Sequence, residues 1–245
     1  TGTVFHVGPI TRNVTDAALL LNVISGWDAR DWFSLPHDGR DWRVGLQDGV
    51  AGLRVAYSRT LGYLTVDAEV AALVDRAAAR FAELGAIVED ADPGFDNPGP
   101  IHTVMWTVGA AKLLRQIPAD RHDLIEMGLR QAAERGEAVS TAEYIDAQDQ
   151  RMELGIHQRR FHERYDLLLT PVLSAPVPKV GTAPSAPFLS PFNLTQQPAA
   201  SVPCGFTASG LPVALQIVGP AHRDDLVLRA ARAYESVQPW PAPQR

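Results

Sequence analysis

The spacing of apolar and polar positions divides the first part of the chain into strand-like and helix-like segments. Residues 53–57 alternate with a period of two, which predicts a strand, and a similar strand begins again at residues 86–88. The apolar residues between them fall on one helical face that ends before Gly85: Val70, Leu73, Val74, Ala77, Ala78, Phe81 and Leu84. A strand, a helix and a second strand in so few residues predict a βαβ unit with parallel strands. We therefore expect an α/β fold.

Helix start signals indicate further helices on both sides of this unit. Asn13 stands three residues before Asp16, and the apolar stretch that follows ends at Gly26, which predicts a short helix. Residues from about 100 to 165 are mostly helical in pattern and predict a helical layer. The helices expected in this layer are 106–117, 120–135 and a long helix that begins at a capping box from Ser140 to Glu143.

The last third of the chain, from about residue 166 to residue 237, predicts the core of the sheet. A short apolar run at 166–171 is closed by proline and predicts a buried strand. Residues 201–204 and 213–218 flank a loop with two glycines and predict an antiparallel pair, and a final helix at about 224–237 covers the sheet. The apolar runs are nearly continuous, as in strands covered on both faces, so we expect half a sheet to leave part of them bare.

Composition limits the class of protein and its partners. Hydrophobic residues make up 46% of the 245 residues and charged residues 20%, which indicates a packed protein, and we expect one domain over residues 1–245. The net charge of −6 comes without a basic stripe, which argues against nucleic acid, and no apolar run approaches the roughly 20 residues of a membrane helix. The single cysteine, Cys204, fits a cytoplasmic protein and lies in a strand pattern that predicts a buried thiol.

Two stretches of sequence resemble one known family. The first is GPITRNVTDAALLL at 8–21; the second is PFNLTQQPAASVPCG at 191–205, followed by GLPVALQIVG at 210–219. Between them, YDLLLTP at 165–171 is similar to the strand that leads toward that family's active-site loops. In combination and order, these motifs resemble the C-terminal part of the amidase-signature family. The resemblance implies an α/β/α fold with a mixed β-sheet covered by helices.

The resemblance also implies a reaction whose catalytic residues lie upstream of Gly8. Family members cleave carboxamide C–N bonds with a serine nucleophile, a second serine in a cis peptide and a lysine that accepts and returns protons. This sequence has no Ser-Ser pair and no glycine-rich serine loop, and its lysines, Lys112 and Lys179, are expected to be solvated. We therefore assign no catalytic residue here and expect the chain to be inactive alone, with an N-terminal catalytic part of the same protein as its partner and a small-molecule amide as substrate.

Two further features agree with a piece of a longer protein. The chain opens at Thr1 rather than at a methionine, within what resembles a loop that runs into a helix. The proline-rich segment 171–191 is shorter than the family leads us to expect, so either the loop is trimmed or residues are missing there.

Three residues are candidates for substrate contact. The resemblance places Ser190, just before Asn193, along the wall of the acyl pocket, and Trp106 can face the same pocket from the helical layer. Asn193 and Gln196 are polar residues in a stretch that otherwise reads as buried, so each needs hydrogen-bond partners. For Asn193 and Gln196, the more common interpretation is that their side chains tie the loop to the core. For Trp106, the more common interpretation is an ordinary core residue.

Several alternatives remain open at this point. The chain could belong to an amidotransferase A-type subunit that supplies ammonia to a partner enzyme, or it could be a non-catalytic binding module with half an amidase fold. A homodimer is possible. The seven histidines lack metal-ligand spacing, so we expect no metal site and no cofactor, and the absence of Gly-x-Ser-x-Gly argues against a self-contained Ser-His-Asp hydrolase.

Overall fold

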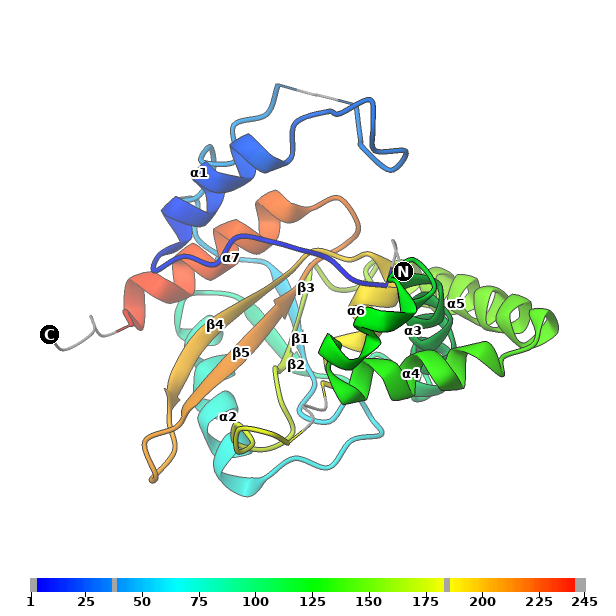
Figure 1. Ribbon diagram of the computed structural model, residues 1–245. Coiled ribbons are helices and arrows are strands. Elements are labelled where there is room, and N and C mark those ends of the chain that lie inside the picture. Colours follow the sequence, from blue (N-terminus) through cyan, green and yellow to red (C-terminus); the bar gives the residue numbers. More distant parts are fainter. Residues whose placement is uncertain (1–3, 37–38, 183–185, 241–245) are drawn as a thin grey trace, which may run out of the picture.

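Five strands of the chain form one mixed sheet in the order β2-β1-β3-β5-β4 (Figure 1). The computed structural model describes residues 4–36, 39–182 and 186–240. The strands are β1 (Arg54–Tyr57), β2 (Ile87–Asp90), β3 (Leu167–Pro171), β4 (Ala199–Phe206) and β5 (Pro212–Val218). β1 is parallel to both β2 and β3, whereas β5 is antiparallel to both β3 and β4. The expected α/β class, the parallel βαβ strands and the antiparallel pair are all confirmed.

One face of the sheet is covered by α2 (Ala68–Glu83) and α7 (Asp224–Val237). Asp67 caps α2 by accepting hydrogen bonds from the backbone N–H groups of Glu69 and Val70. In the core, the rings of Phe81 from α2 and Tyr234 from α7 stack with centroids 5.7 Å apart. Outside this layer, α1 (Val14–Ile24) packs along α7, which the ribbon shows directly (Figure 1).

The other face carries the helical layer that the sequence predicts. It contains α3 (Gly99–Leu114), η1 (Ala119–Leu124), α4 (Met127–Glu137), α5 (Thr141–Phe161) and α6 (Ser190–Thr195). Strand β3 shows how the two faces are filled, because Leu167 and Leu169 pack with α2 and α7 whereas Leu168 packs with α5 and α6. The capping box at Ser140 and Glu143 is present at the start of α5.

The helical layer departs from the sequence prediction in three places. The expected helix at 120–135 is wrong: Ile125 is extended, so the chain forms a 3₁₀-helix, breaks, and starts again where Glu126 caps α4. α3 begins seven residues earlier than expected, at Gly99. The backbone N–H of Gly99 donates a hydrogen bond to the side chain of Asn97, just before the helix. α6 was not expected as a helix at all.

The expectation that the apolar strands would be partly bare is also wrong. Leu167, Leu168 and Leu169 are fully buried, and so are Ile217 and Val218, because α2 and α7 cover one face of the sheet and the helical layer covers the other. Many of the exposed large apolar side chains gather near the start of the chain: Phe5, Val7, Ile10, Leu19, Leu20, Val23, Ile24, Trp27, Trp32, Phe33 and Leu35. No helix in the described part of the chain is long and apolar enough to span a membrane.

Cys204 lies in β4 and is buried, as its sequence context predicts. Burial raises the pKa of its thiol to about 12, so the thiol stays protonated at pH 8, whereas an exposed cysteine has a pKa of about 8.5. We expect a maleimide or disulfide reagent to label the native chain at least about 100-fold more slowly than the urea-unfolded chain. Rapid stoichiometric labelling of the native protein would contradict the position of β4.

Candidate functional site

The short helix α6 is held in place by hydrogen bonds from the elements around it. Arg151 of α5 donates from Nε to the carbonyl oxygen of Leu194 over 2.6 Å. Gln216 of β5 donates from Nε2 to the carbonyl oxygen of Phe188, 3.0 Å away, and to Oγ1 of Thr170, 2.9 Å away. Gln216 and Thr170 are both buried, so these bonds are shielded from water and fix the approach to α6 against the sheet.

Ser190 and Asn193 lie three residues apart on α6, which places them on neighbouring parts of one face. The Asn193 amide donates from Nδ2 to the carbonyl oxygen of Leu189 over 3.2 Å and accepts at Oδ1 from Nδ1 of His6 over 3.0 Å. The Ser190 hydroxyl lies 3.4 Å from the carbonyl oxygen of Pro187. Asn193 therefore ties the N-terminal segment to α6, which is the structural interpretation of this residue.

Trp106 comes from α3, which packs against α6. Its ring stacks on His102 with centroids 6.2 Å apart and an interplanar angle of 9°, and the residue is 36% exposed. Within the described residues, no hydrogen bond or ring contact joins Trp106 to Ser190 or Asn193. The structure thus brings Ser190 and Asn193 together and places Trp106 on the adjacent helix.

The sequence analysis did not identify three polar residues of this region. His6 forms a hydrogen bond with Asn193, 187 positions away, and no local sequence pattern predicts such a contact. Gln216 and Thr170 could have been found, because each is a polar residue inside an otherwise apolar strand and must therefore find a partner. The predicted lysines behave as expected, since both Lys112 and Lys179 are exposed.

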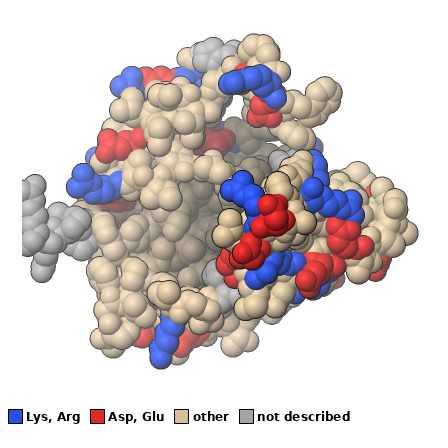
Figure 2. Space-filling view, viewed as in Figure 1, with Lys and Arg blue, Asp and Glu red and all other residues tan. Residues whose placement is uncertain are grey.

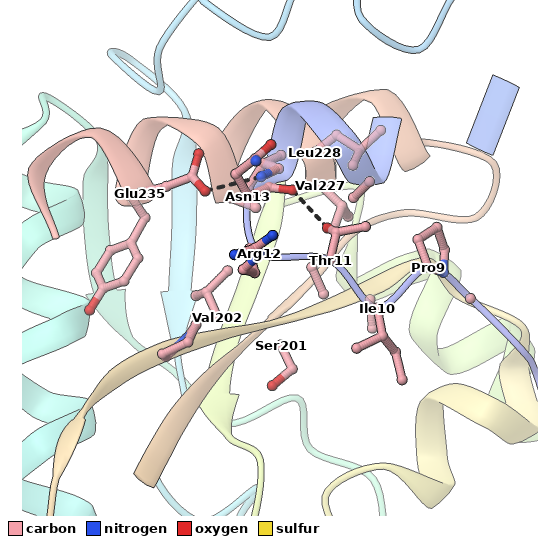
Figure 3. A pocket seen from close by; sticks show the side chains of 18 of the residues that line it. Pro9, Ile10, Thr11, Arg12, Asn13, Ser201, Val202, Val227, Leu228 and Glu235 are labelled. Atoms are coloured by element: carbon pink, nitrogen blue, oxygen red, sulfur yellow. Dashed lines mark hydrogen bonds between the residues drawn. The ribbon is translucent and has the colours of Figure 1, made fainter. Parts of the chain in front are cut away.

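A cleft of about 620 Å³ opens between the N-terminal segment, β4 and α7. Residues 8–14 form one wall, residues 198–203 the second, and Val227, Leu228 and Glu235 belong to the third (Figure 3). Across the rim of the cleft, the backbone N–H of Val14 donates to the Glu235 carboxylate over 3.0 Å. Figure 2 shows a hollow on this face whose floor is made of uncharged side chains, with acidic and basic side chains clustered along its right-hand side. Because β4 is the last strand of the sheet, the cleft lies beside an edge that pairs with no described strand.

None of the candidate residues Trp106, Ser190 and Asn193 lines this cleft. They lie instead among the helices on the opposite face of the sheet. In the parts of the chain that the structure describes, no three His, Cys, Asp or Glu side chains gather as metal ligands would. The geometry therefore offers a supported helix face and an open cleft on opposite faces of the sheet.

Comparison with known proteins gives the arrangement a family. A family model described as Amidase matches residues 3–228, nearly the whole chain. The chain belongs to the amidase signature family. Its mixed sheet and helical layers match a bacterial aryl acylamidase of that family with a TM-score of 0.83 and 30% identity, over 95% of this chain and 53% of the acylamidase chain. The family resemblance and the fold that it implies are thereby confirmed.

The chain covers a similar share of two curated relatives. The acylamidase of Rhodococcus erythropolis is 34% identical over 95% of this chain and 52% of the relative. The A-type subunit of the glutamyl-tRNA(Gln) amidotransferase of Geotalea daltonii is 29% identical over 96% of this chain and 55% of the relative. The chain therefore spans about half the length of the curated relatives that it matches.

Proposed function

We propose that this chain is the C-terminal portion of a single amidase domain, in a protein that hydrolyses carboxamides to a carboxylate and ammonia or an amine. One observation carries the proposal: almost the whole chain aligns, with 34% identity, to only about half of an acylamidase. The reaction would pass through an acyl-serine intermediate formed in an N-terminal part of the same protein. A single buried cysteine fits a reducing compartment such as the cytoplasm.

The residues of this chain support the proposal that the chemistry lies elsewhere in the protein. A lysine that accepts a proton at neutral pH needs burial to lower its pKa and a serine within hydrogen-bond reach. Lys112 and Lys179 are exposed, and the sequence has no Ser-Ser pair. The N-terminal catalytic part is thus the proposed partner, and no cofactor is needed for acyl transfer through serine.

Two features of this chain suit such a partner. Edge strand β4 can accept another strand, and the cleft beside it has room for the side chains that would come with that strand. On the helical side, Ser190, Asn193 and Trp106 would supply one wall of the acyl pocket. The remaining walls would come from the N-terminal part.

The chain alone should not hydrolyse simple amides above background. The reason is that the sequence has no Ser-Ser pair and no glycine-rich serine loop that would supply an oxyanion hole. Release of aniline from an acylanilide measures this, with a full-length acylamidase such as the Rhodococcus erythropolis relative as the positive control. Turnover by the chain alone that a serine-directed fluorophosphonate abolishes would overturn the proposal.

Trp106 gives a test of the pocket wall in the complete enzyme. Replacing Trp106 with Ala should raise KM for an aryl amide about tenfold, equivalent to about 1.4 kcal/mol, with a smaller change in kcat, because aromatic contact area contributes to binding of the acyl group. Leu113→Ala is the matched control, since Leu113 is an exposed apolar residue of the same helix. Equal effects of the two substitutions on KM would show that Trp106 is not part of the pocket wall.

The amidotransferase alternative has specific support, because the A-type subunit from Geotalea daltonii is 29% identical over 96% of the chain. Two hydrolases have higher TM-scores, 0.83 for the aryl acylamidase and 0.82 for the 6-aminohexanoate cyclic dimer hydrolase, whereas the peptide amidase of Stenotrophomonas maltophilia, at 0.73, is close to the 0.72 of the A-type subunit of Thermotoga maritima. If the complete protein hydrolyses amides without companion subunits, that result will favour the amidase over the amidotransferase subunit. An intact mass near 26.6 kDa for the protein as made in its source would favour a non-catalytic binding module instead.

A further inference from the structure

Three polar side chains form a row across the sheet. Thr170 of β3 pairs with Gln216 of β5, and Gln216 pairs in turn with Ser201 of β4. Leu169 and Ile217, the neighbours of the first two, pack with α2 and α7, so the alternation of side chains turns the row toward the helical layer. Thr170 and Gln216 are buried, whereas Ser201 is exposed and lines the cleft. The row therefore runs from inside the sheet to its open edge at β4.

The hydrogen bonds of this row fix the orientation of the Gln216 amide. The hydroxyl of Thr170 donates its proton to the carbonyl oxygen of Pro171 over 2.9 Å, so toward Gln216 it can only accept. The carbonyl oxygen of Phe188 is also an acceptor. Both groups therefore face the NH₂ group of Gln216, whose Nε2 lies 2.9 Å from Oγ1 of Thr170 and 3.0 Å from the Phe188 oxygen. Both N–H donors are used, and Oε1 points away from them.

Oε1 of Gln216 is left as an acceptor with no donor. Gln216 is 3% exposed, and no hydrogen bond from a described residue reaches its Oε1. This oxygen is not among the unpartnered polar atoms that the described part of the chain shields completely from solvent, so a donor can approach it. A nearly buried carbonyl oxygen without a partner is costly, and such groups are almost always paired. The oxygen therefore calls for an N–H or O–H group from outside the described residues.

We propose that Gln216 is a positioning residue of the complete enzyme, whose Oε1 accepts a hydrogen bond from the N-terminal catalytic part. This inference rests on the proposed function, in which that part docks at the β4 edge. Adjacent strands lie about 4.8 Å apart, so a strand added to β4 brings its own loops within two strand spacings of Gln216. The exposed Ser201 shows that the described helices leave this end of the row uncovered.

The two ends of the Gln216 amide would then hold two different parts of the enzyme. Nε2 holds the carbonyl oxygen of Phe188, just before α6, and α6 carries the proposed wall of the acyl pocket. Oε1 would hold the catalytic part. One rigid amide would thus keep the nucleophile in register with the acyl pocket. A displacement of about 1 Å between such parts can lower the rate about 100-fold.

Two substitutions in the complete enzyme separate this role from a merely structural one. Gln216→Met keeps the size of the side chain and removes Oε1, so it should lower kcat for an acylanilide about 10- to 100-fold. Thr170→Val is the matched comparison, because it removes one acceptor of the Nε2 group and leaves Oε1 in place. It loosens only the approach to α6 and should act mainly on KM. Equal loss of kcat in the two variants, or unchanged kcat in Gln216→Met, would overturn the proposal.

NMR tests the same hydrogen bond without any substitution. The ¹⁵N-labelled 245-residue chain is titrated with the unlabelled N-terminal part, and the side-chain amide resonances of Gln216 are followed. They should move downfield, because a donor on Oε1 polarises the whole amide. Those of Gln150, exposed on α5, should stay in place.

The NMR result decides if the Gln216 variant fails to fold. Unchanged Gln216 resonances at saturation would show that water alone satisfies Oε1 and would overturn the proposal. A Gln216 shift without amide hydrolysis by the mixed parts would support the contact and count against the proposed amidase activity alone.

Discussion

Mixing this chain with the separately expressed N-terminal catalytic part should raise amide hydrolysis about a million-fold over this chain alone, and also above the N-terminal part alone. Loss of a serine nucleophile and its base costs roughly that factor in kcat in a serine hydrolase, and each isolated part would lack something essential. The N-terminal part would bring the nucleophile and base. This chain would complete the sheet and the acyl pocket. Initial rates measured at increasing ratios of the two parts give both the gain and the apparent Kd.

The edge of β4 supplies the control for this reconstitution. Ser201 is exposed on β4 and lines the cleft, so Ser201→Arg should weaken association at least tenfold. Ser209→Arg adds the same charge in the exposed turn between β4 and β5, outside the cleft, and should have little effect. A stable, monomeric chain that binds neither a hydrophobic dye nor the N-terminal part would show a complete domain and end the half-amidase interpretation. Self-association would instead indicate that copies cover one another's exposed apolar residues.

Replacing Gly136 with Ala should destabilise the chain by about 3 kcal/mol or more. α4 crosses α3 so closely that a Cβ atom at Gly136 would lie 2.0 Å from the carbonyl oxygen of Thr107 and 2.8 Å from the backbone nitrogen of Val108. These are backbone atoms within a helix and cannot move aside as a side chain would. The prediction runs against helix propensity, by which Ala is favoured over Gly by about 1 kcal/mol.

Gly155 is the matched control for this substitution. It lies inside α5, where an added Cβ would meet nothing within 4 Å, so Gly155→Ala should stabilise the chain by about 0.5–1 kcal/mol. Urea unfolding followed by circular dichroism gives both free energies of unfolding. A Gly136 variant as stable as the native chain would mean that α3 and α4 do not cross at this point.

The elements predicted correctly from sequence are those whose local signals agree with their packing. α7 has the expected bounds, 224–237, and α2 begins at its Asp67 cap, because each helix buries a continuous apolar face against the sheet. The break between η1 and α4 was missed because residues 119–137 are polar and give no clear period across Ile125. α6 has only six residues, too few for a periodic pattern.

The site could be predicted from sequence only as far as single segments. Ser190 and Asn193 are close in sequence and therefore close in space. The bond from His6 to Asn193 depends on the N-terminal segment crossing to α6. Such contacts are set by tertiary packing, which periodicity does not describe.

The open edge of β4 has a consequence for how such a protein is made. A ribosome synthesises the N-terminal part of a polypeptide first and releases the C-terminal part last. In one continuous chain, the strand that is proposed to cover β4 would already have been synthesised when β4 leaves the ribosome. It could therefore pair with the β4 edge during synthesis. If two separate genes encoded the parts, the same edge would be released uncovered, and its unpaired backbone groups could pair with a strand of another protein. Synthesis of both parts in one chain would thus protect the β4 edge from pairing with other proteins, and synthesis from two genes would lose that protection.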